Sequence, residues 1–546
     1  MAFNIADLFE YAVDAVPDRT ALVIAPRRLT FAALDEKANR LANHLLGEGF
    51  GHADHIGIYG QNSIEWVVAM LAAFKIRAVP ININFRYVED ELLYLFDNAD
   101  LVCLVYAREF APQVAAVLDR APKLRHSIVV DDRSDEDSTG LGSIPFDQAS
   151  EAASPDRPGV VRSPDDHYVL YTGGSTGMPK GVVWRHEDVL HALGGCIDAY
   201  TNERVASDTT LAEKARANAS PLVSLNAPPL MHGAAQWGAL RFLFEGNTVV
   251  FLPKFSPESV WATVQAERVN TISITGDAMA RPMVEALEHQ PDRWDLSSLL
   301  VLSSSAAIFS PTVKDRFLEL LPNLMIIDAI GSSESGLNGM AAQGKGQTAT
   351  HGGGGPTVIA GRDAVVLDDD LRPLAPGSGV VGKLARGGNL PLGYYKDPAK
   401  TATTFVTSPD GARYVVAGDY ALLEEDGSIT LLGRGSVCIN SGGEKIYPEE
   451  VEATLKAHEA VFDAIVVGVP DPRWGQAVTA VVEVRKDVGA PTLADLAAHT
   501  RTRLAAYKTP RHLVLVDHIV RSPSGKPDYP WATRLAADTV LGPSAD

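Results

Sequence analysis

Between about residues 168 and 330, short runs rich in β-branched residues alternate with longer segments of helical character. The expected strands are residues 248–252, 271–275, 299–304 and 324–330. Ser256 and Pro257 are typical of a helix N-cap and first turn, so we expect a helix from there to about Val269 and another over residues 311–321. The alternation predicts a layered α/β domain, whose ligands bind where strands end.

The chain has 546 residues, which is too long for one ordinary core, so we expect at least two domains. After Arg434 the pattern favours helices over residues 448–458 and 492–506 and strands over 464–469 and 478–484. We therefore predict a large N-terminal domain of layered α/β subdomains, residues 1–434, and a small α+β C-terminal domain, residues 435–546. The polar segment 131–165 is expected to connect two subdomains. The polar segment 201–220 is expected to lie near the substrate entrance.

Composition narrows the class of protein. The 48 Lys and Arg residues against 68 Asp and Glu residues give a net charge of −20, which argues against a nucleic-acid surface and against adhesion to anionic lipid. Cys103, Cys196 and Cys438 are widely spaced and fit neither a disulfide framework nor a CxxC metal site. The N-terminus lacks the pattern of a secretory signal, and no apolar run is long enough to cross a bilayer. We expect an acidic cytoplasmic enzyme with small-molecule substrates.

A glycine-rich segment follows the apolar run 168–171. It consists of Thr172, Gly173, Gly174, Ser175, Thr176, Gly177, Met178, Pro179 and Lys180. Its glycines permit backbone torsions that expose successive N–H groups to an anion, and its hydroxyls and lysine add donors and charge. A Walker loop is excluded because Pro179 precedes Lys180 and Gly181 follows it. We predict a loop that binds phosphate; a solvated loop would explain the composition but not the preceding strand.

With Gly331-Ser-Ser-Glu334, Gly418-Asp419, Gly433-Arg434 and Pro523-Ser-Gly-Lys526, this segment resembles the adenylate-forming superfamily of acyl-CoA synthetases, luciferases and peptide-synthetase adenylation domains. The resemblance covers nearly the whole chain in the family's order. Residues 276–282 and 439–450 are similar to actinobacterial fatty-acid or steroid side-chain CoA ligases. The resemblance implies that a carboxylic acid, long-chain or steroidal, is activated by ATP as acyl-AMP and then transferred to CoA, while the small domain rotates about residues 434–436.

The resemblance also implies a nucleotide site. Residues 172–177 and Lys180 would hold the β- and γ-phosphates of ATP. The other implied nucleotide residues are Ser304, Ser305, Ala306, Ile330, Gly331, Ser332, Ser333, Asp419, Arg434 and Lys445. Asp419 would accept both ribose hydroxyls, although a turn aspartate is the simpler interpretation. Ile330 stands at the family's aromatic position, so the base would be held by apolar contact, and Ser436 replaces the usual charged hinge residue.

The resemblance implies that two charged residues, Lys526 and Glu334, act in catalysis. Lys526 would bridge the carboxylate and the α-phosphate; without the resemblance it reads as a solvated lysine in a Pro/Gly-rich tail. Glu334, with Thr176 nearby, would hold Mg²⁺, for which oxygen donors are suited. A serine nucleophile elbow is absent, because the fifth position from Gly331 is Ser335 instead of glycine.

The resemblance assigns the remaining residues to CoA and the acyl group. Ser441, Gly442 and Gly443 would line the CoA tunnel, although an ordinary glycine turn explains them equally well. His232 would gate the substrate, and Trp237, Thr275, Gly276 and Met279 would line the acyl pocket, although most such residues are simply core.

Two other functions stay open from the residues, and a homodimer is compatible with the resemblance. One alternative function is adenylation that loads a carrier protein. The other is a nucleotide-binding module without catalysis, against which the presence of Lys526 and Glu334 argues.

Overall fold

The computed structural model describes residues 3–174, 177–198, 203–307, 309–347, 356–441, 444–486, 488–521 and 526–542. Contacts divide the chain into two compact units. The first contains Met1–Ile274, Ala286–Leu302 and Asn389–Thr403; the second contains Thr275–Glu285, Ser303–Gly388 and Thr404–Asp546. The units follow from contacts alone, so a boundary at residues 434–436 stays a prediction.

The first unit contains most of the helices. They are α1 (Ile5–Ala15), α2 (Phe31–Gly47), α3 (Ile64–Lys75), α4 (Glu89–Asn98), α5 (Ala111–Leu118), α6 (Phe146–Glu151), α7 (His186–Leu193), α8 (Thr210–Ala217), α9 (Gly233–Phe244) and α10 (Pro257–Glu267). Its strands are β1 (Thr20–Ile24), β2 (Arg27–Thr30), β3 (His55–Tyr59), β4 (Val79–Ile83), β5 (Leu101–Ala107), β6 (His126–Val130), β7 (Ile144–Pro145), β8 (His167–Gly174), β9 (Gly177–Arg185), β10 (Val223–Asn226), β11 (Thr248–Phe251), β12 (Thr271–Ile274) and β19 (Gly393–Tyr394).

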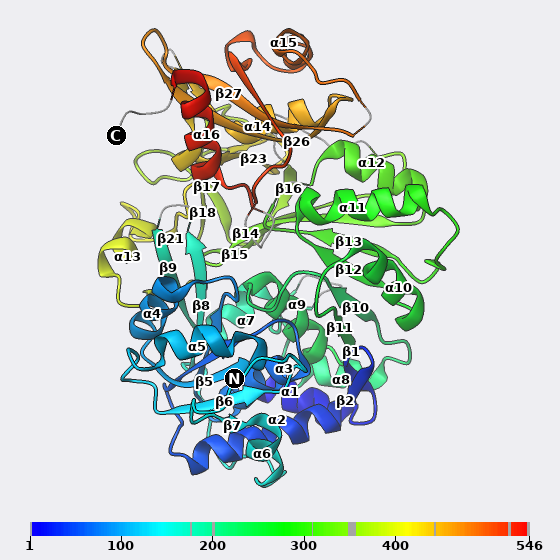
Figure 1. Ribbon diagram of the computed structural model, residues 1–546, viewed down its shortest axis with the longest axis vertical. Coiled ribbons are helices and arrows are strands. Elements are labelled where there is room, and N and C mark those ends of the chain that lie inside the picture. Colours follow the sequence, from blue (N-terminus) through cyan, green and yellow to red (C-terminus); the bar gives the residue numbers. More distant parts are fainter. Residues whose placement is uncertain are drawn as a thin grey trace. The chain divides into compact units, whose positions relative to one another are not determined.

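Parallel strands dominate the first unit, as the alternation predicts. β10 pairs in parallel with both β11 and β12, and α9 and α10 connect these three strands along the chain (Figure 1). A second parallel sheet has the order β4-β3-β5-β6-β7. The Ser256 hydroxyl accepts a hydrogen bond from the Ser259 N–H at 3.1 Å and so caps α10, which confirms the predicted helix start.

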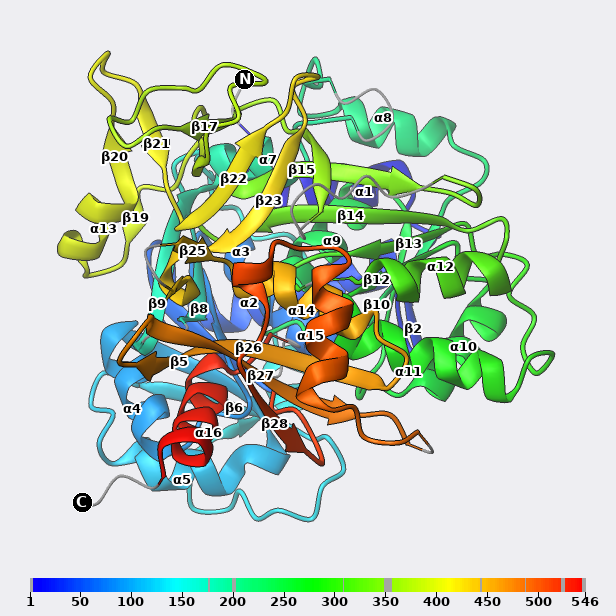
Figure 2. The same cartoon turned by 90° about the horizontal axis from the view of Figure 1, so that it is seen from above.

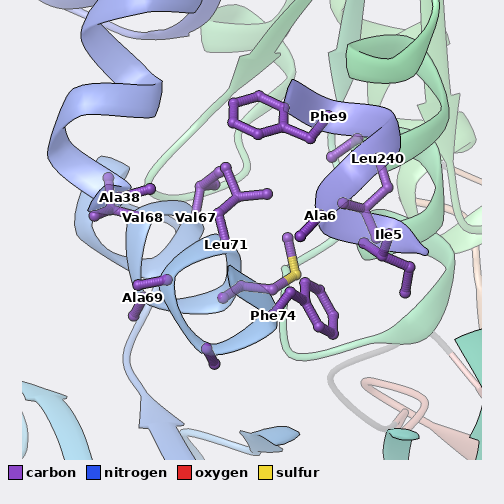
Figure 3. Close-up of a cluster of buried hydrophobic side chains, with 14 of the residues drawn as sticks. Ile5, Ala6, Phe9, Ala38, Val67, Val68, Ala69, Leu71, Phe74 and Leu240 are labelled. Carbon is purple, nitrogen blue, oxygen red and sulfur yellow. The ribbon is translucent and has the colours of Figure 1, made fainter. Parts of the chain in front are cut away.

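A buried cluster joins the N-terminal helix to its neighbours. Figure 3 shows Ile5 and Phe9 of α1 near Phe74 of α3 and Leu240 of α9. Every residue of α3 is buried, which explains the long apolar run there. None of the described helices is long and apolar enough to cross a membrane.

The second unit is rich in antiparallel strands. They are β14 (Met325–Ser332), β15 (Gly336–Gln343), β16 (Thr357–Ala360), β17 (Ala364–Leu367), β18 (Gly382–Arg386), β20 (Phe405–Thr407), β21 (Arg413–Val415), β22 (Asp419–Leu423), β23 (Ile429–Arg434), β24 (Ile439–Ser441), β25 (Glu444–Ile446), β26 (Val461–Asp471), β27 (Gly475–Val484) and β28 (His512–Val516). Its helices are α12 (Pro311–Leu320), α14 (Pro448–Lys456), α15 (Leu493–Arg501) and α16 (Tyr529–Leu541), while α11 (Gly276–His289), β13 (Val301–Ser304) and α13 (Pro398–Thr404) have residues in both units.

The C-terminal part of the second unit confirms an α+β arrangement. β24, β26 and β27 form an antiparallel sheet, and β28 adds in parallel to β27 (Figure 2). The strands are longer than predicted, because β26 and β27 stay paired from Val461 to the tight connection after Asp471. The helix expected over residues 492–506 ends at Arg501. The polar segments 131–165 and 201–220 contain α6 and α8, respectively.

Candidate active site

The glycine-rich segment forms a β-hairpin. β8 runs to Gly174 and β9 starts at Gly177, with Thr172 opposite Lys180. Residues 175–176, which include two of the predicted phosphate contacts, lie outside the described residues. A loop over the whole of residues 172–180 is therefore wrong in extent, because strands joined by so short a connection stay paired almost to the turn.

Asn82 of β4 ties this hairpin to the segment before His232. Its Oδ1 accepts a hydrogen bond from the Tyr171 N–H at 2.9 Å, and its Nδ2 donates to the carbonyl oxygens of Tyr171 at 2.8 Å and Met231 at 2.7 Å. A buried amide with its bonds satisfied fixes the segments that it joins. Sequence reasoning missed Asn82, although a polar residue in an otherwise apolar strand was an available signal.

Lys180 forms an ion pair with Asp397, a residue that sequence reasoning also missed. Asp397 follows β19, which pairs with β9, and the Tyr395 N–H donates to the Gly181 carbonyl at 2.8 Å. The hydrogen bond from Lys180, followed by that from the Lys400 N–H, lowers the pKa of Asp397. The cation of the predicted phosphate site is therefore already engaged by a carboxylate of the same unit.

His232 and Trp237 lie at the start of α9. His232 is the N-cap residue, in an extended conformation, and Trp237 is buried one turn later. The Trp237 ring lies edge-on to Tyr168 with centroids 5.5 Å apart, and the Tyr168 hydroxyl donates to Gln236 Oε1 at 2.8 Å. Trp237 Nε1 has no hydrogen-bond partner among the described residues.

Glu334 lies in the turn between β14 and β15. Because Ser332 is still paired with Gly336, the prediction that the strand ends at Ile330 is wrong by two residues. The turn itself is residues 333–335, and the Ser335 N–H donates to Ser332 Oγ at 3.1 Å. Glu334 is half-buried at the tip, where a carboxylate is accessible to a ligand.

The hairpin that carries Glu334 is built tightly. A Cβ atom on Gly331 would lie 2.2 Å from the Gly336 carbonyl oxygen, so no larger residue fits this backbone. Arg386, missed by sequence reasoning, is 4% exposed and donates through Nη1 to the carbonyls of Ser335 and Leu337 at 3.0 Å each. Burial lowers the pKa of Arg386.

Two predicted subsites meet at the start of α11. The Ser304 hydroxyl, assigned to the nucleotide, accepts a hydrogen bond from the N–H of Gly276, assigned to the acyl group, at 3.0 Å. Thr275 and Met279 beside it are buried. Gly276 has a φ of +49°, which favours glycine and explains the residue type at this helix start.

The other nucleotide residues around the β13 end and β14 differ in exposure. Ser305 is half-buried and Ala306 is exposed, with a φ of +66° that is uncommon for a residue other than glycine. Ile330 is buried among Val358 and Leu384. Its side chain thus belongs mainly to the core of the second unit.

The two residues predicted to hold the ribose lie opposite each other. Asp419 starts β22 and pairs with Arg434, the last residue of β23. The Arg434 and Ser436 side chains lie outside the described part of the chain.

The predicted CoA segment is a second hairpin. Ser441 ends β24, is buried, and pairs with Glu444 of β25. Gly442, Gly443 and the side chain of Lys445 lie outside what the structure describes.

Lys526 is exposed and lies next to Pro527, which pairs with Arg521; we call these two paired residues the stem. Arg521 and Pro527 form an antiparallel bridge across residues 522–526, of which residues 522–525 are not described. Asp528 then caps α16 by accepting a hydrogen bond from the Trp531 N–H at 2.9 Å. Within the described residues, no group of three or more His, Cys, Asp or Glu side chains could hold a metal ion.

Comparison with known proteins covers the whole chain. A family profile described as AMP-binding enzyme matches residues 9–395, and one described as AMP-binding enzyme C-terminal domain matches residues 450–526. A medium/long-chain-fatty-acid–CoA/3-oxocholest-4-en-26-oate–CoA ligase of Mycolicibacterium smegmatis is 53% identical over 97% of this chain and 96% of its own length. A 3-oxocholest-4-en-26-oate–CoA ligase of Rhodococcus rhodochrous is 52% identical over the same shares.

Solved structures share the fold. The anthranilate CoA ligase AuaEII in complex with anthranoyl-AMP aligns with a TM-score of 0.84 at 22% identity over 100% of this chain and 99% of its own. A Mycobacterium tuberculosis fatty acyl CoA synthetase aligns with a TM-score of 0.71 at 22% identity over 98% and 99%. At these identities the likeness concerns the fold, a large α/β part followed by a small C-terminal domain.

Proposed function

The chain belongs to the family of AMP-binding enzymes, and on that premise we propose that it is an ATP-dependent ligase that joins a carboxylic acid to CoA. In the first step a carboxylate oxygen attacks the α-phosphorus of ATP, and the bond to pyrophosphate breaks. In the second step the CoA thiolate attacks the acyl carbon, and the bond to AMP breaks. The observation that carries this proposal is 53% identity over 97% of the chain to a protein named as a CoA ligase.

The acid is a medium- or long-chain fatty acid or a steroid side-chain acid such as 3-oxocholest-4-en-26-oate. This proposal rests on the names of relatives that match the chain along 97% of its length. The burial of Trp237, Thr275 and Met279 supports an apolar acyl group. Such a group gains about 25 cal/mol for every Å² of apolar surface that it removes from water.

The protein's part in the chemistry is to position groups and to balance charge, because phosphoryl transfer needs little else. In the proposed site the β8–β9 hairpin and Lys180 bind the β- and γ-phosphates, Asp419 and Arg434 bind the ribose, and Lys526 stabilises the charge that builds between carboxylate and α-phosphate. The opposed positions of Asp419 and Arg434 support the ribose assignment.

Mg²⁺ fits this donor set as an ion bound largely by its substrate. Mg²⁺ keeps several waters and takes one or two protein carboxylates beside the phosphates of a nucleotide. Glu334, half-buried at a turn held by Arg386, would supply that carboxylate, and Thr176 would supply a hydroxyl. When bound, the ion neutralises phosphate charge.

The second step uses CoA on a different surface. After rotation about residues 434–436, the hairpin of β24 and β25 would replace Lys526 at the active centre, and Gly443 would leave room for the thiol arm. The antiparallel pairing of β24 with β25 supports this placement. Residues 1–434 and 435–546 are accordingly the proposed moving domains.

Location and assembly are separate proposals. A cytoplasmic location is supported by the net charge of −20 and by the three cysteines, none of which is in a disulfide. A homodimer is tested by sedimentation, where it would give twice the mass of one chain.

The substrate proposal is tested by AMP release from the purified chain. Acids of short, medium and long chain and a steroid acid are each supplied with ATP, Mg²⁺ and CoA. We expect AMP with the longer and the steroidal acids, at rates that depend on CoA. If AMP forms with none of the acids, the proposed function is wrong; if acyl-AMP forms but free CoA is not consumed, carrier-protein loading replaces it.

A further inference from the structure

A buried ion pair lies in the first turns of α11. Asp277 directly follows the predicted acyl-pocket residue Gly276, and Arg281 lies one turn later. Arg281 Nη2 and Asp277 Oδ2 are 3.1 Å apart, and the two residues are 5% and 4% exposed. The other oxygen of Asp277 accepts a hydrogen bond from the Ser310 N–H at 2.8 Å. The Asp277 carboxylate is thus shared between the Arg281 guanidinium and a backbone N–H.

The guanidinium of Arg281 also faces an aromatic ring from β26. Its central carbon lies 5.9 Å from the centroid of the Phe462 ring. This distance is within the range of a cation–π contact, which gains strength when it is removed from water. Both residues belong to the second compact unit, yet Arg281 precedes the proposed hinge at residues 434–436 and Phe462 follows it.

Asp463, the next residue, joins several cations. Arg521 donates to it twice, from Nε at 2.7 Å and from Nη2 at 2.8 Å, and Lys456 Nζ lies 3.4 Å away. Burial by itself raises the pKa of Asp463, but the charges of Lys456, Arg521 and Arg281 outweigh it and hold this pKa well below its usual range. Asp463 is thus held ionised between α11 and Arg521.

Arg521 is the first residue of the stem that carries Lys526. It bridges to Pro527, the residue that follows Lys526, and the Asp528 N–H donates to the Val520 carbonyl at 3.3 Å. The position of this stem is therefore set by the bidentate pair with Asp463. The contacts of two adjacent β26 residues, Phe462 with Arg281 and Asp463 with Arg521, thus connect α11 to the residues that flank Lys526.

We propose that Arg281 is a positioning residue that docks Phe462 and Asp463 against α11 and thereby places Lys526 for adenylate formation. The inference rests on the proposed function, in which Lys526 serves the first step alone. It adds that the helix bordering the acyl pocket and the lysine that acts on the acyl carboxylate are mechanically connected. Thioester formation, for which Lys526 is withdrawn, does not use this contact.

Measuring the two half-reactions separately in the Arg281→Met variant distinguishes this positioning role from a purely structural one. Acyl-AMP formation is measured in a single turnover without CoA, and thioester formation is measured from synthetic acyl-AMP and CoA. We expect the first rate to fall roughly 10- to 30-fold, the size of a desolvated cation–π contact and its charge coupling, and the second to stay within about twofold. Met keeps an unbranched apolar stem but carries no charge.

Because Arg281→Met leaves Asp277 without its cation, Phe462→Leu provides a second test with the ion pair intact. We expect the same selective loss, roughly threefold. Arg413→Met is the matched control: its guanidinium lies 5.2 Å from the Phe405 ring, in the same unit but in a different sheet from Phe462, and neither half-reaction should change. Thermal unfolding verifies that each variant is folded.

Equal losses in both half-reactions of folded variants, or an unchanged adenylation rate, overturn the docking role. A wild-type chain that forms neither product overturns the proposed function and this inference together. The wild-type reactions therefore distinguish failure of the enzyme assignment from failure of the Arg281 assignment.

Discussion

At the scale of single residues, Lys526 is the charge on which the first half-reaction is proposed to depend. We expect Lys526→Ala to lower acyl-AMP formation roughly 10²- to 10³-fold, as is typical when one preorganised charge stabiliser is lost. Thioester formation from synthetic acyl-AMP should be retained. ATP–pyrophosphate exchange measures the first step, and Lys486→Ala, at another exposed lysine of the same unit, is the control. Adenylation at the wild-type rate would remove Lys526 from the chemistry.

Lys180 and Asp397 give a second residue-scale prediction. Because the Asp397 carboxylate already holds Lys180, pyrophosphate must compete with it for the ammonium group. Asp397→Asn removes the charge and still caps the Lys400 N–H, so we expect pyrophosphate to bind more tightly, by up to about fivefold, the worth of an exposed ion pair. Calorimetry measures this affinity.

The effect of Asp397→Asn should vanish when Lys180 is already Gln, because the competing pair no longer exists. Weaker binding in Asp397→Asn alone would mean instead that the carboxylate orients Lys180 for phosphate.

At the scale of elements, the β14–β15 hairpin sets where Glu334 lies. A Cβ atom on Gly331 would meet the Gly336 carbonyl oxygen at 2.2 Å, so Gly331→Ala must separate the two strands at the turn. We expect weaker Mg²⁺-dependent ATP binding, measured by calorimetry. Gly344→Ala just beyond β15 is the control, since its nearest neighbour would be 3.8 Å away. Equal ATP affinity in all three proteins would place nucleotide binding away from this hairpin.

The docking of α1 has a pH dependence that follows from His186. The Ile5 N–H points at His186 Nδ1 at 3.4 Å, a contact that needs an unprotonated nitrogen, and burial lowers the pKa of His186 from 6.5 to about 4. The charge of Asp166 opposes this shift, while those of His167 and Arg162 add to it. His186 therefore binds a proton more readily in the unfolded chain than in the folded chain.

Above pH 6.5, protonation of His186 does not change the free energy of unfolding. As the pH drops from 6.5 towards 4, this free energy falls by about 1.4 kcal/mol for each pH unit. We expect the fall in unfolding temperature between pH 7.5 and pH 5 to be smaller in His186→Gln than in the wild type. An identical fall in both proteins would show that another group dominates acid sensitivity.

Local patterns predicted the elements better than they predicted the contacts between them. Ser256 and Pro257 mark the start of α10 because capping acts within one turn. The partners of the site were missed because they are distant in sequence: Asp397 is 217 residues from Lys180, Asn82 is 89 residues from Tyr171, and Arg386 is 51 residues from Ser335. Strand ends at Gly174 and Ser332 were missed because pairing with the next strand extends both.

At the scale of the whole molecule, the two half-reactions are proposed to use two different surfaces of one small domain. Gly443→Leu should block the proposed thiol passage and spare acyl-AMP formation. The control is Gly489→Leu, since a Cβ atom there would have no neighbour within 4 Å. Single-turnover rates of both steps check this, and a parallel loss of both would mean that residues 442–443 serve folding or the nucleotide.

In the proposed function, one chain both activates an acid with ATP and passes it to CoA. Mass spectrometry of a single reaction tests it: the purified protein is mixed with a long-chain or steroid acid, ATP and Mg²⁺, and CoA is added afterwards. We predict acyl-AMP and pyrophosphate before CoA, then acyl-CoA and AMP in equal amounts after it. Formation of the thioester without a preceding adenylate, or release of ADP and phosphate in place of AMP and pyrophosphate, would show that the proposed two-step reaction is wrong.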